Sequence, residues 1–385
     1  MSTPGFVQPF VQPQLLRIDV KPAGPMESQS GLQMLRPRIY GALLEATGVD
    51  RARSVAAIVI HPASNFHGHY LLEPLMERGI SCMGLNTRYV NNDSTLLMER
   101  VIQDLGAGVR QLRAIGYRKV MLIGNSGGAA LVSFYQAQAE RLTLTHLADG
   151  APISLATADL PPVEGIALAA AHAGRARLMR EWIDPAVIDE SDPTQTDPEL
   201  DLYGPARPLP LDAAFLARFR QAQQERLARV EAWVVERLEH LRRAGGPQVD
   251  QSFVLHRTHA EPRCVDITID RNERKPGSVW GDPATVNAAA NSMGRFNTLT
   301  SFMSQWSSRS QADGPDNLAR TSVPVLHLTY CADQSVFPST VDLWRTAAGG
   351  RIRNVDIHEG DHYLVGRSDL VARVADELAA FAQSL

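Results

Sequence analysis

A serine between glycines is the residue whose type and setting first suggest chemistry. It is Ser126, in the run Gly124-Asn125-Ser126-Gly127-Gly128. The run lies between an apolar stretch, Lys119 to Ile123, and a helical pattern. A nucleophilic serine on such a strand-to-helix turn needs a strained backbone and small residues two positions before and after it. A glycine-rich turn without catalysis would show the same pattern, but the strand before it and the helix after it favour a catalytic serine.

A serine hydroxyl becomes a useful nucleophile when a neighbouring imidazole takes its proton, so a histidine is required. His362 lies in a loop that follows the apolar run Ile352 to Ile357 and precedes the last helical pattern. The chain has 11 histidines, and only this one has such a setting. We therefore predict that His362 is the base, and that His358, at the end of the strand, is structural.

A carboxylate must hold that imidazole in one tautomer and stabilise its charged form. Asp333 lies just past the apolar run Val323 to Leu328, and we predict that it is this acid. The chain order is then nucleophile, acid, base. Asp361 is adjacent to His362 and would have difficulty reaching its ring. Asp184 and Glu181, after the preceding strand, stay open as alternatives.

The elements that must position these residues alternate in type. Between Ser54 and Ala139, short apolar runs alternate with helical patterns, which is typical of parallel strands joined by crossover helices. We predict an α/β fold with a mostly parallel central sheet and helices on both faces. The expected strands are Leu15 to Val20, Ile39 to Leu44, Val55 to Ile60, Ile80 to Leu85, Lys119 to Ile123, Val163 to Ala170, Val323 to Leu328 and Ile352 to Ile357. The expected helices are His67 to Arg78, Thr95 to Ile115, Gly127 to Glu140, and Ser368 to Phe381 with Ser368 as its cap.

A long segment interrupts this alternation. It contains an irregular stretch, Asp184 to Pro210, and a helical pattern, Leu211 to Arg243, with apolar residues at three- and four-residue steps. We expect a mainly helical insertion over residues 174–318, between two late strands. The remaining divisions are a core in residues 51–173 and 319–385, and an N-terminal arm with leading strands in residues 1–50.

The N-terminal arm carries a short repeat. Phe-Val-Gln-Pro occurs twice, as Phe6 to Pro9 and Phe10 to Pro13. One duplication cannot make a solenoid, which needs several repeats. We expect an extended arm on the surface, and an arm that clasps a partner is the alternative.

On these residues the chain resembles the α/β-hydrolase fold superfamily, in its serine-hydrolase branch. The resemblance covers two blocks, Ala56 to His172 and Val323 to Leu385. It rests on the serine turn, on the loops of Asp333 and His362, and on the stretch Ile58 to His69. It implies an esterase-like activity, and the segment between the blocks lies where such proteins commonly carry a cap.

Acyl transfer through a serine also needs hydrogen-bond donors for the oxyanion. The backbone N–H of Gly127, directly after the nucleophile, is the first by geometry. The resemblance implies a second donor in the loop after the third strand, which often begins His-Gly. Here Pro62 replaces that glycine and has no N–H. We therefore expect the amide of Ala63 to serve, with Ser64 as the alternative.

The same loop contains three histidines, and His-x-His recurs in zinc proteins. No cysteine or carboxylate cluster nearby completes a set of ligands for His61, His67 and His69. We expect no metal and no cofactor. His61 is expected to hydrogen-bond the backbone of the loop, and the other two to flank the following helix.

Composition narrows the class of protein. Hydrophobic residues make up 44% and charged residues 21%, as in ordinary folded proteins. With 38 Lys plus Arg against 42 Asp plus Glu, the net charge is -4, so nucleic acid is not an expected partner. The 3 cysteines are widely spaced, which favours reduced thiols in a cytoplasm. We find no export signal and no apolar run long enough to cross a membrane.

These observations predict a serine hydrolase that cleaves a carboxylic ester through an acyl-enzyme on Ser126. Thioesterase, lactonase, acyltransferase and C–C bond hydrolase use the same three residues and stay open, as does a binding protein without catalysis. A homodimer also stays open. The insertion supplies aromatic residues that suit cores or an apolar ester pocket, and arginines that suit loop contacts or a substrate carboxylate: Trp182, Trp233, Trp280, Trp306, Arg175, Arg257, Arg263 and Arg271.

Overall fold

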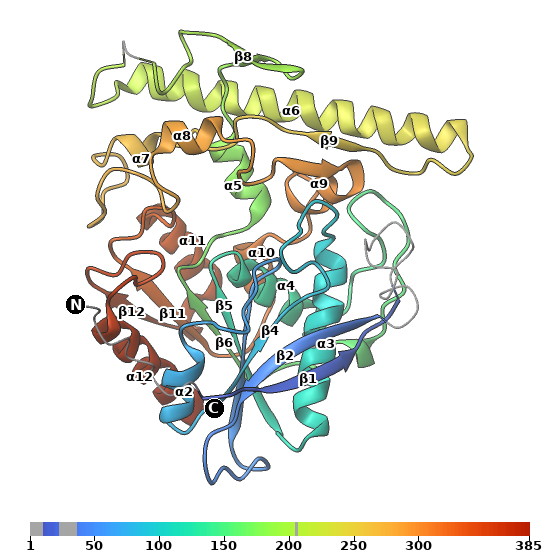
Figure 1. Ribbon diagram of the computed structural model, residues 1–385, viewed down its shortest axis with the longest axis vertical. Helices are drawn as coiled ribbons and strands as arrows, with labels where there is room; N and C mark the ends of the chain where they lie inside the picture. The colour runs from blue at the N-terminus through green and yellow to red at the C-terminus, as the bar shows by residue number, and fades with distance from the viewer. Residues whose placement is uncertain (1–10, 23–36, 205–206) are drawn as a thin grey trace, which may run out of the picture.

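The computed structural model describes residues 11–22, 37–204 and 207–385. At its centre is an eight-stranded sheet with the order β1-β2-β4-β3-β5-β6-β11-β12 (Figure 1). β2 pairs antiparallel with β1 and β4, and every other neighbouring pair is parallel. The predicted mostly parallel sheet is therefore confirmed. Its strands are β1 (Gln14–Asp19), β2 (Arg38–Leu44), β3 (Val55–Ile60), β4 (Ser81–Leu85), β5 (Lys119–Asn125), β6 (Gly165–Ala169), β11 (Val325–Tyr330) and β12 (Ile352–Ile357).

The central strands are buried along nearly their whole length because both faces of the sheet are covered. Every residue of β3, β4 and β6 is buried, as expected for parallel strands between two helical layers. β1, at one edge, instead alternates between exposed and buried residues over its second half. All eight expected strands are present, with ends shifted by a few residues.

Helices cover both faces of the sheet. On one face, apolar residues of α3 (Met98–Ala114) and α4 (Gly128–Glu140) join a single core cluster with the strands. On the other face, α2 (Leu72–Glu77) and α12 (Ser368–Ser384) complete a second cluster. Figure 1 shows the two pairs on opposite sides of the sheet. The layer of α4 also contains α10 (Gly314–Leu318), which packs against α4 and α11 (Pro338–Ala348).

Two helix starts differ from the sequence-based prediction. The helix expected from His67 begins only at Leu72, because side chains of the preceding loop accept hydrogen bonds from the backbone N–H groups of that same loop. Asn65 Oδ1 accepts from the His67 N–H at 3.1 Å, and His69 Nδ1 accepts from the Leu71 N–H at 3.3 Å. The prediction of Ser368 as a cap is wrong, because Ser368 is already helical and the residue before it makes no side-chain cap.

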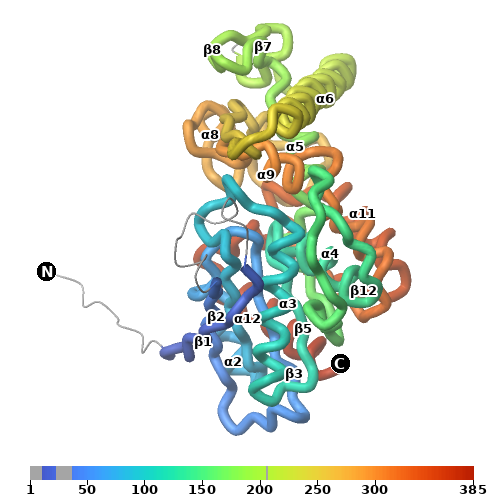
Figure 2. Tube along the Cα trace, turned by 90° about the vertical axis from the view of Figure 1, so that its right-hand side faces the viewer, coloured from blue at the N-terminus to red at the C-terminus, as the bar shows by residue number. Residues whose placement is uncertain are grey.

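The chain between β6 and β11 makes an excursion from the sheet. It lies beyond the carboxyl ends of the strands and forms the upper part of the molecule in Figures 1 and 2. Its longest element is the amphipathic α6, whose buried residues follow the predicted three- and four-residue steps. The small hairpin of β7 and β8 was not expected from the sequence. The elements are α5 (Arg175–Trp182), β7 (Val187–Asp189), β8 (Asp192–Thr196), α6 (Ala213–Ala244), β9 (Ser252–Val254), α7 (Pro262–Val265), α8 (Pro283–Ala288), β10 (Phe296–Thr298) and α9 (Leu299–Gln305).

The excursion leaves the core and returns to it at one point. The N–H of Gly314, the first residue of α10, donates to the carbonyl oxygen of Ala173 at 2.8 Å. Gly174 follows with φ +139°, and a Cβ there would lie 3.0 Å from the Ala312 carbonyl oxygen. Residues 174–313 are therefore closed off by a narrow neck, and α10, which falls within the predicted insertion, packs with the core helices.

Two predictions concern the ends of the chain and membranes. The repeat Phe6 to Pro9 lies outside the described residues, and residues 11–13 of the second copy precede β1 without regular structure. In the described ranges, no helix combines the length and the apolar character needed to cross a bilayer.

Candidate active site

Ser126 lies on the sharp turn between β5 and α4. Its φ is +55°, a left-handed value that is uncommon for a residue with a side chain. A Cβ on Gly124 would lie 2.5 Å from the Gly128 carbonyl oxygen, and one on Gly128 would lie 2.0 Å from that of Ile60. Both contacts are to backbone and leave no room for a methyl group. The predicted need for small residues on either side of Ser126 is therefore confirmed.

The three residues predicted as nucleophile, base and acid lie side by side. The Ser126 hydroxyl is 3.1 Å from Nε2 of His362, and Nδ1 of His362 is 2.7 Å from Oδ2 of Asp333. His362 and Asp333 are buried. The other carboxylate oxygen of Asp333 accepts from the N–H groups of Ser335 (2.7 Å) and Val336 (3.1 Å). An ionised carboxylate can only accept, so it requires the proton of His362 to be on Nδ1 and leaves Nε2 free to accept from Ser126.

The rival carboxylates bind other groups. Asp184 accepts from Arg257 Nε at 2.6 Å and from Asn287 Nδ2 at 2.7 Å, inside the excursion. Glu181 pairs with Arg263. Asp361 accepts from backbone N–H groups of its own loop. Among the described residues, Asp333 is the carboxylate that contacts His362.

A second histidine, His172, lies against these residues and was not singled out from the sequence. Its ring centroid is 5.4 Å from that of His362, and its Nε2 is 3.0 Å from the Ser335 hydroxyl. Burial, and then the neighbouring His362, lower the pKa of His172 to about 3, so its ring is neutral near pH 7. The signal in the sequence is its position directly after the apolar run that forms β6.

His61 binds the loop that follows β3. Its Nδ1 accepts from the N–H groups of Ala63 (3.2 Å) and Ser64 (3.0 Å), which confirms that it hydrogen-bonds the loop backbone. The Ala63 amide was predicted as an oxyanion donor, but its N–H points at the imidazole in this structure. Burial first, and then Arg175, hold the pKa of His61 well below its usual range.

A cavity of about 360 Å³ opens at Ser126. One wall is apolar and comes mainly from the excursion, and the other is polar and comes mainly from the loops after β3 and β4. Arg175, which also lines the cavity, binds Asp93 (2.9 Å) and Gln305 and lies over the ring of Trp306. The apolar wall consists of Leu178, Val279, Trp280, Met293, Trp306 and Tyr363, and the polar wall includes Ser64, Asn65, Asn91, Asn92 and Asp93.

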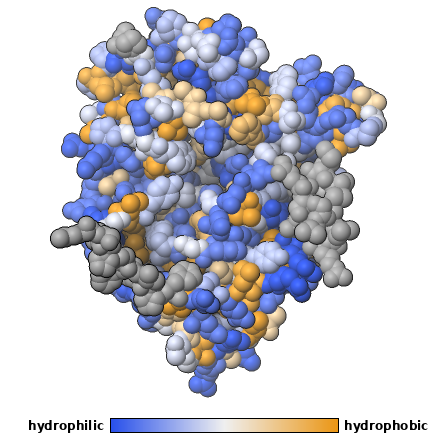
Figure 3. All heavy atoms as spheres, in the orientation of Figure 1, coloured by the Kyte–Doolittle hydropathy of each residue, from blue (hydrophilic) through white to orange (hydrophobic). Residues whose placement is uncertain are grey.

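The four predicted tryptophans divide between cavity, core and surface. Trp280 and Trp306 line the cavity, whereas Trp182 is buried in a separate cluster. Trp233 is exposed on α6 beside a second groove. On the face seen in Figure 3, hydrophobic residues gather along the upper part, over the excursion, and in smaller patches elsewhere.

The predicted arginines mostly hold loops. Arg257 pairs with Asp184 and Asp201, and Arg263 pairs with Glu181, Glu261 and Asp270. With Arg175 bound to Asp93, three of the four have carboxylate partners. These contacts neutralise their charge within the protein.

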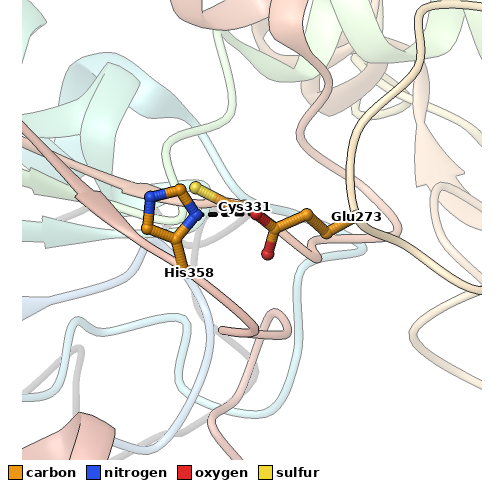
Figure 4. Close-up of side chains that lie close together, drawn as sticks. All are labelled: Glu273, Cys331 and His358. Carbon is orange, nitrogen blue, oxygen red and sulfur yellow. Dashed lines mark hydrogen bonds and ion pairs between the residues drawn. The ribbon is translucent and has the colours of Figure 1, made fainter.

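Glu273, Cys331 and His358 form a cluster of potential metal ligands (Figure 4). Glu273 Oε1 is 2.6 Å from His358 Nδ1, and its other oxygen accepts from the Glu359 N–H at 2.7 Å. Burial raises the pKa of the Cys331 thiol to about 11. Both carboxylate oxygens and the imidazole Nδ1 are thus engaged, in a contact that ties the excursion to the loops after β11 and β12.

The chain matches no protein-family model and no curated protein. Solved structures similar to it include the esterase domain of a Rhodothermus marinus protein (13% identity, 97% of this chain and 99% of that one, TM-score 0.48). Est1E from Butyrivibrio proteoclasticus has 11% identity over 90% and 96% of the two chains, with TM-score 0.47. An alpha/beta fold family hydrolase from Bacillus anthracis str. Sterne has 11% identity over 97% and 99%, with TM-score 0.44. Likenesses this distant carry no argument about activity.

The fold can be identified from the sheet topology and from the positions of the three site residues. The sheet is mostly parallel, its crossover helices lie on both faces, and a serine at positive φ lies between β5 and α4. An acid and a histidine follow that serine in chain order, at the same end of the sheet. The chain has the α/β-hydrolase fold.

Proposed function

We propose that this protein is a serine hydrolase that cleaves a carboxylic ester through an acyl-enzyme on Ser126. The observation that supports it is the continuous series of contacts from Ser126 Oγ to His362 Nε2 (3.1 Å) and from His362 Nδ1 to Asp333 Oδ2 (2.7 Å). The serine end of this series faces a cavity and the acid end is buried. This arrangement suits acyl transfer.

In the proposed reaction, His362 takes the hydroxyl proton as Ser126 attacks the ester carbonyl carbon. The tetrahedral intermediate collapses when His362 gives that proton to the leaving alcohol, and the acyl group stays on Ser126. A water molecule then attacks the acyl carbon while His362 removes its proton, and His362 returns this proton to the Ser126 oxygen as the second tetrahedral intermediate collapses. The carboxylic acid product leaves, and Ser126 regains its hydroxyl group. Throughout the reaction, Asp333 keeps the imidazole in place and stabilises its charged form.

The cavity supports a moderately large, partly apolar ester as substrate. Its apolar wall suits an aliphatic or aromatic group, and its polar wall suits a group with hydrogen-bonding atoms. We propose that residues 174–313 of the predicted insertion act as a cap over Ser126, because α5, the end of α9 and the segment around Trp280 contribute most of the apolar wall. The remainder of residues 51–385 would form the hydrolase core.

A fluorophosphonate probe tests the proposal, since it labels a serine that a neighbouring imidazole activates. We expect stoichiometric labelling of Ser126, located by peptide mapping, and loss of hydrolysis in the labelled protein. A panel of esters with varied acyl and alcohol parts, with thioesters, lactones and β-diketones beside them, then identifies the reaction class. Absence of labelling and of turnover on every member would contradict the proposal and favour a binding protein.

A further inference from the structure

His61 lies where the loops after β3 and β5 meet. The two strands are neighbours, with Ile60 opposite Gly124, so the residues that follow each strand face one another. The chain passes from β3 to β4 on one side and to β5 on the other. Ligands of open α/β sheets bind at such a reversal of strand order. His61, the first residue after β3, is therefore placed beside the turn that carries Ser126.

The hydrogen bonds of His61 determine which ring nitrogen carries the proton. Its Nδ1 accepts from two backbone N–H groups, those of Ala63 and Ser64. A nitrogen that accepts hydrogen bonds cannot hold a proton, so the proton of the neutral ring must be on Nε2. If Nδ1 were protonated as well, its N–H would point at the N–H groups of Ala63 and Ser64, and both hydrogen bonds would be lost. His61 is thus held as a neutral ring that presents an Nε2–H.

That Nε2–H points toward Gly127. A Cβ placed on Gly127 would lie 2.9 Å from His61 Nε2, which is the nearest atom outside residues 126–128. His61 lines the same cavity as Ser126, Gly127 and His362. Within the described residues, both hydrogen bonds of its ring are made by Nδ1 and none by Nε2. A donor therefore faces the space beside the nucleophile and the Gly127 amide, and the lack of a side chain at Gly127 keeps that space open.

We propose that the Nε2–H of His61 is the second oxyanion donor, which acts together with the backbone N–H of Gly127. The proposal rests on the proposed function, because it needs a tetrahedral intermediate on Ser126. It gives the Ala63 and Ser64 amides a different task, namely to orient the imidazole. It also accounts for Pro62, since a loop that supplies a side-chain donor does not need an N–H at that position.

A neutral donor suits this place electrostatically. His362 becomes positively charged when it takes the Ser126 proton. Arg175 and His172 are also close enough to His61 to affect its charge. A charged imidazole at residue 61 would repel the imidazolium of His362 in the transition state. A neutral ring stabilises the oxyanion without this cost.

Two substitutions separate the Nε2–H donor from the tether, by which we mean the hydrogen bonds that His61 Nδ1 accepts from the Ala63 and Ser64 N–H groups. In His61→Asn, the amide oxygen can still accept from the Ala63 and Ser64 N–H groups, but the donor at the Nε2 position is lost. In His61→Gln, the longer side chain can place an N–H near that position, but the acceptor for the two amides is lost. Thermal unfolding reports on the tether, and kcat reports on the donor.

We expect His61→Asn to keep a melting temperature close to wild type and to lose on the order of 10²- to 10³-fold in kcat, with a small change in KM. His61→Gln should melt earlier but keep a larger fraction of kcat. A trifluoromethyl ketone, which forms a tetrahedral adduct on the serine, should lose affinity for His61→Asn by a factor similar to the loss in kcat.

Three outcomes would overturn the inference. One is a folded His61→Asn variant with near wild-type kcat. Another is a kcat that falls further in His61→Gln than in His61→Asn, which would assign the effect to the tether that only the Asn variant keeps. The third is a ketone affinity that does not change while kcat falls. Wild-type labelling of Ser126 by fluorophosphonate does not depend on these results, so failure here is distinct from failure of the proposed hydrolase activity.

Discussion

The backbone N–H of His172 donates to the carbonyl oxygen of Ser126 at 3.2 Å. The side chain of the same histidine contacts the Ser335 hydroxyl at 3.0 Å, and the Ser335 N–H donates to Asp333 at 2.7 Å. One residue thus connects the loops after β5, β6 and β11. Contacts within the core thus link Ser126 to Asp333, and the excursion adds a hydrogen bond from Asn272 Nδ2 to the Asp333 carbonyl oxygen at 2.9 Å.

The first prediction concerns the nucleophile. Ser126→Ala should lower ester turnover by on the order of 10³-fold or more, because the acyl-enzyme can no longer form. Fluorophosphonate labelling should be lost as well. Ser133→Ala is a matched control further along α4, where the hydroxyl is buried and donates to the Ala129 carbonyl oxygen. Retention of turnover or label in Ser126→Ala would refute the assignment.

A second prediction separates Asp333 from its rival Asp184. Asp333→Asn should lower kcat by on the order of 10⁴-fold with little change in KM, because an amide can hold the imidazole in the wrong tautomer. Asp184→Asn should instead lower stability by about 1 to 3 kcal/mol, since it weakens a buried contact with Arg257. Steady-state kinetics and melting curves on both variants decide. An inactive, folded Asp184→Asn with an active Asp333→Asn would reverse the assignment.

A third prediction tests whether the excursion contributes to substrate selectivity. Trp280 lines the cavity and is 48% exposed, so Trp280→Ala should change the fold little. We expect kcat/KM for a bulky ester to fall about tenfold or more, relative to a short acetyl ester. Trp233 is 43% exposed on α6, outside the cavity, so Trp233→Ala is a matched control. Equal losses on both esters would show that Trp280 does not select the substrate.

Trp306 is a less suitable probe of the same wall. It is buried and belongs to the apolar cluster of α6 and α9. Trp306→Ala should cost about 3 to 5 kcal/mol of stability, because a large cavity is left in the core. The melting temperature of this variant therefore tests its packing role.

The fourth prediction concerns stability at low pH. His259 is buried against Trp182 and Trp280, and neither ring nitrogen has a partner in the described part of the chain. Burial lowers its pKa from 6.5 to about 3. Between these values the unfolded chain binds a proton that the folded protein does not. The free energy of unfolding should therefore fall as the pH decreases from about 6.5 toward 3, by up to about 1.4 kcal/mol per pH unit for this residue.

His259→Phe removes that proton uptake. Denaturant unfolding at a series of pH values should show a shallower dependence on pH than wild type below about 6.5. His240→Phe, exposed on α6, controls for the loss of a histidine as such. An unchanged slope in His259→Phe would mean that His259 does not contribute to acid sensitivity.

The sheet and the relative order of Ser126, Asp333 and His362 could be predicted because their causes are local. Buried parallel strands need continuous apolar runs, and the serine turn needs glycines at fixed positions. The hairpin of β7 and β8 could not be predicted, since β7 has only 3 residues and β8 is polar and lacks alternation. Asp192 binds Thr194 there, so side-chain contacts replace an apolar face.

The neighbourhood of His61 and His172 was harder to predict, for a different reason. The type of each residue is compatible with several roles, and the role depends on where its ring nitrogens point. The Ala63 amide was expected to face the oxyanion, but the turn of the loop directs it to His61. Such directions follow from backbone dihedrals in irregular loops, which residue spacing does not determine.

The neck between Ala173 and Gly314 affects how the sequence of this protein can change in evolution. Because the chain departs and rejoins at a single hydrogen bond, the number of residues in between scarcely affects the sheet, and lengthening a loop costs little entropy. Segments of other length or composition should be exchangeable at this junction, provided that they replace the contact which Asn272 makes with the Asp333 carbonyl oxygen. Substrate range could then diverge rapidly among descendants of one scaffold, without any alteration to the strands beneath.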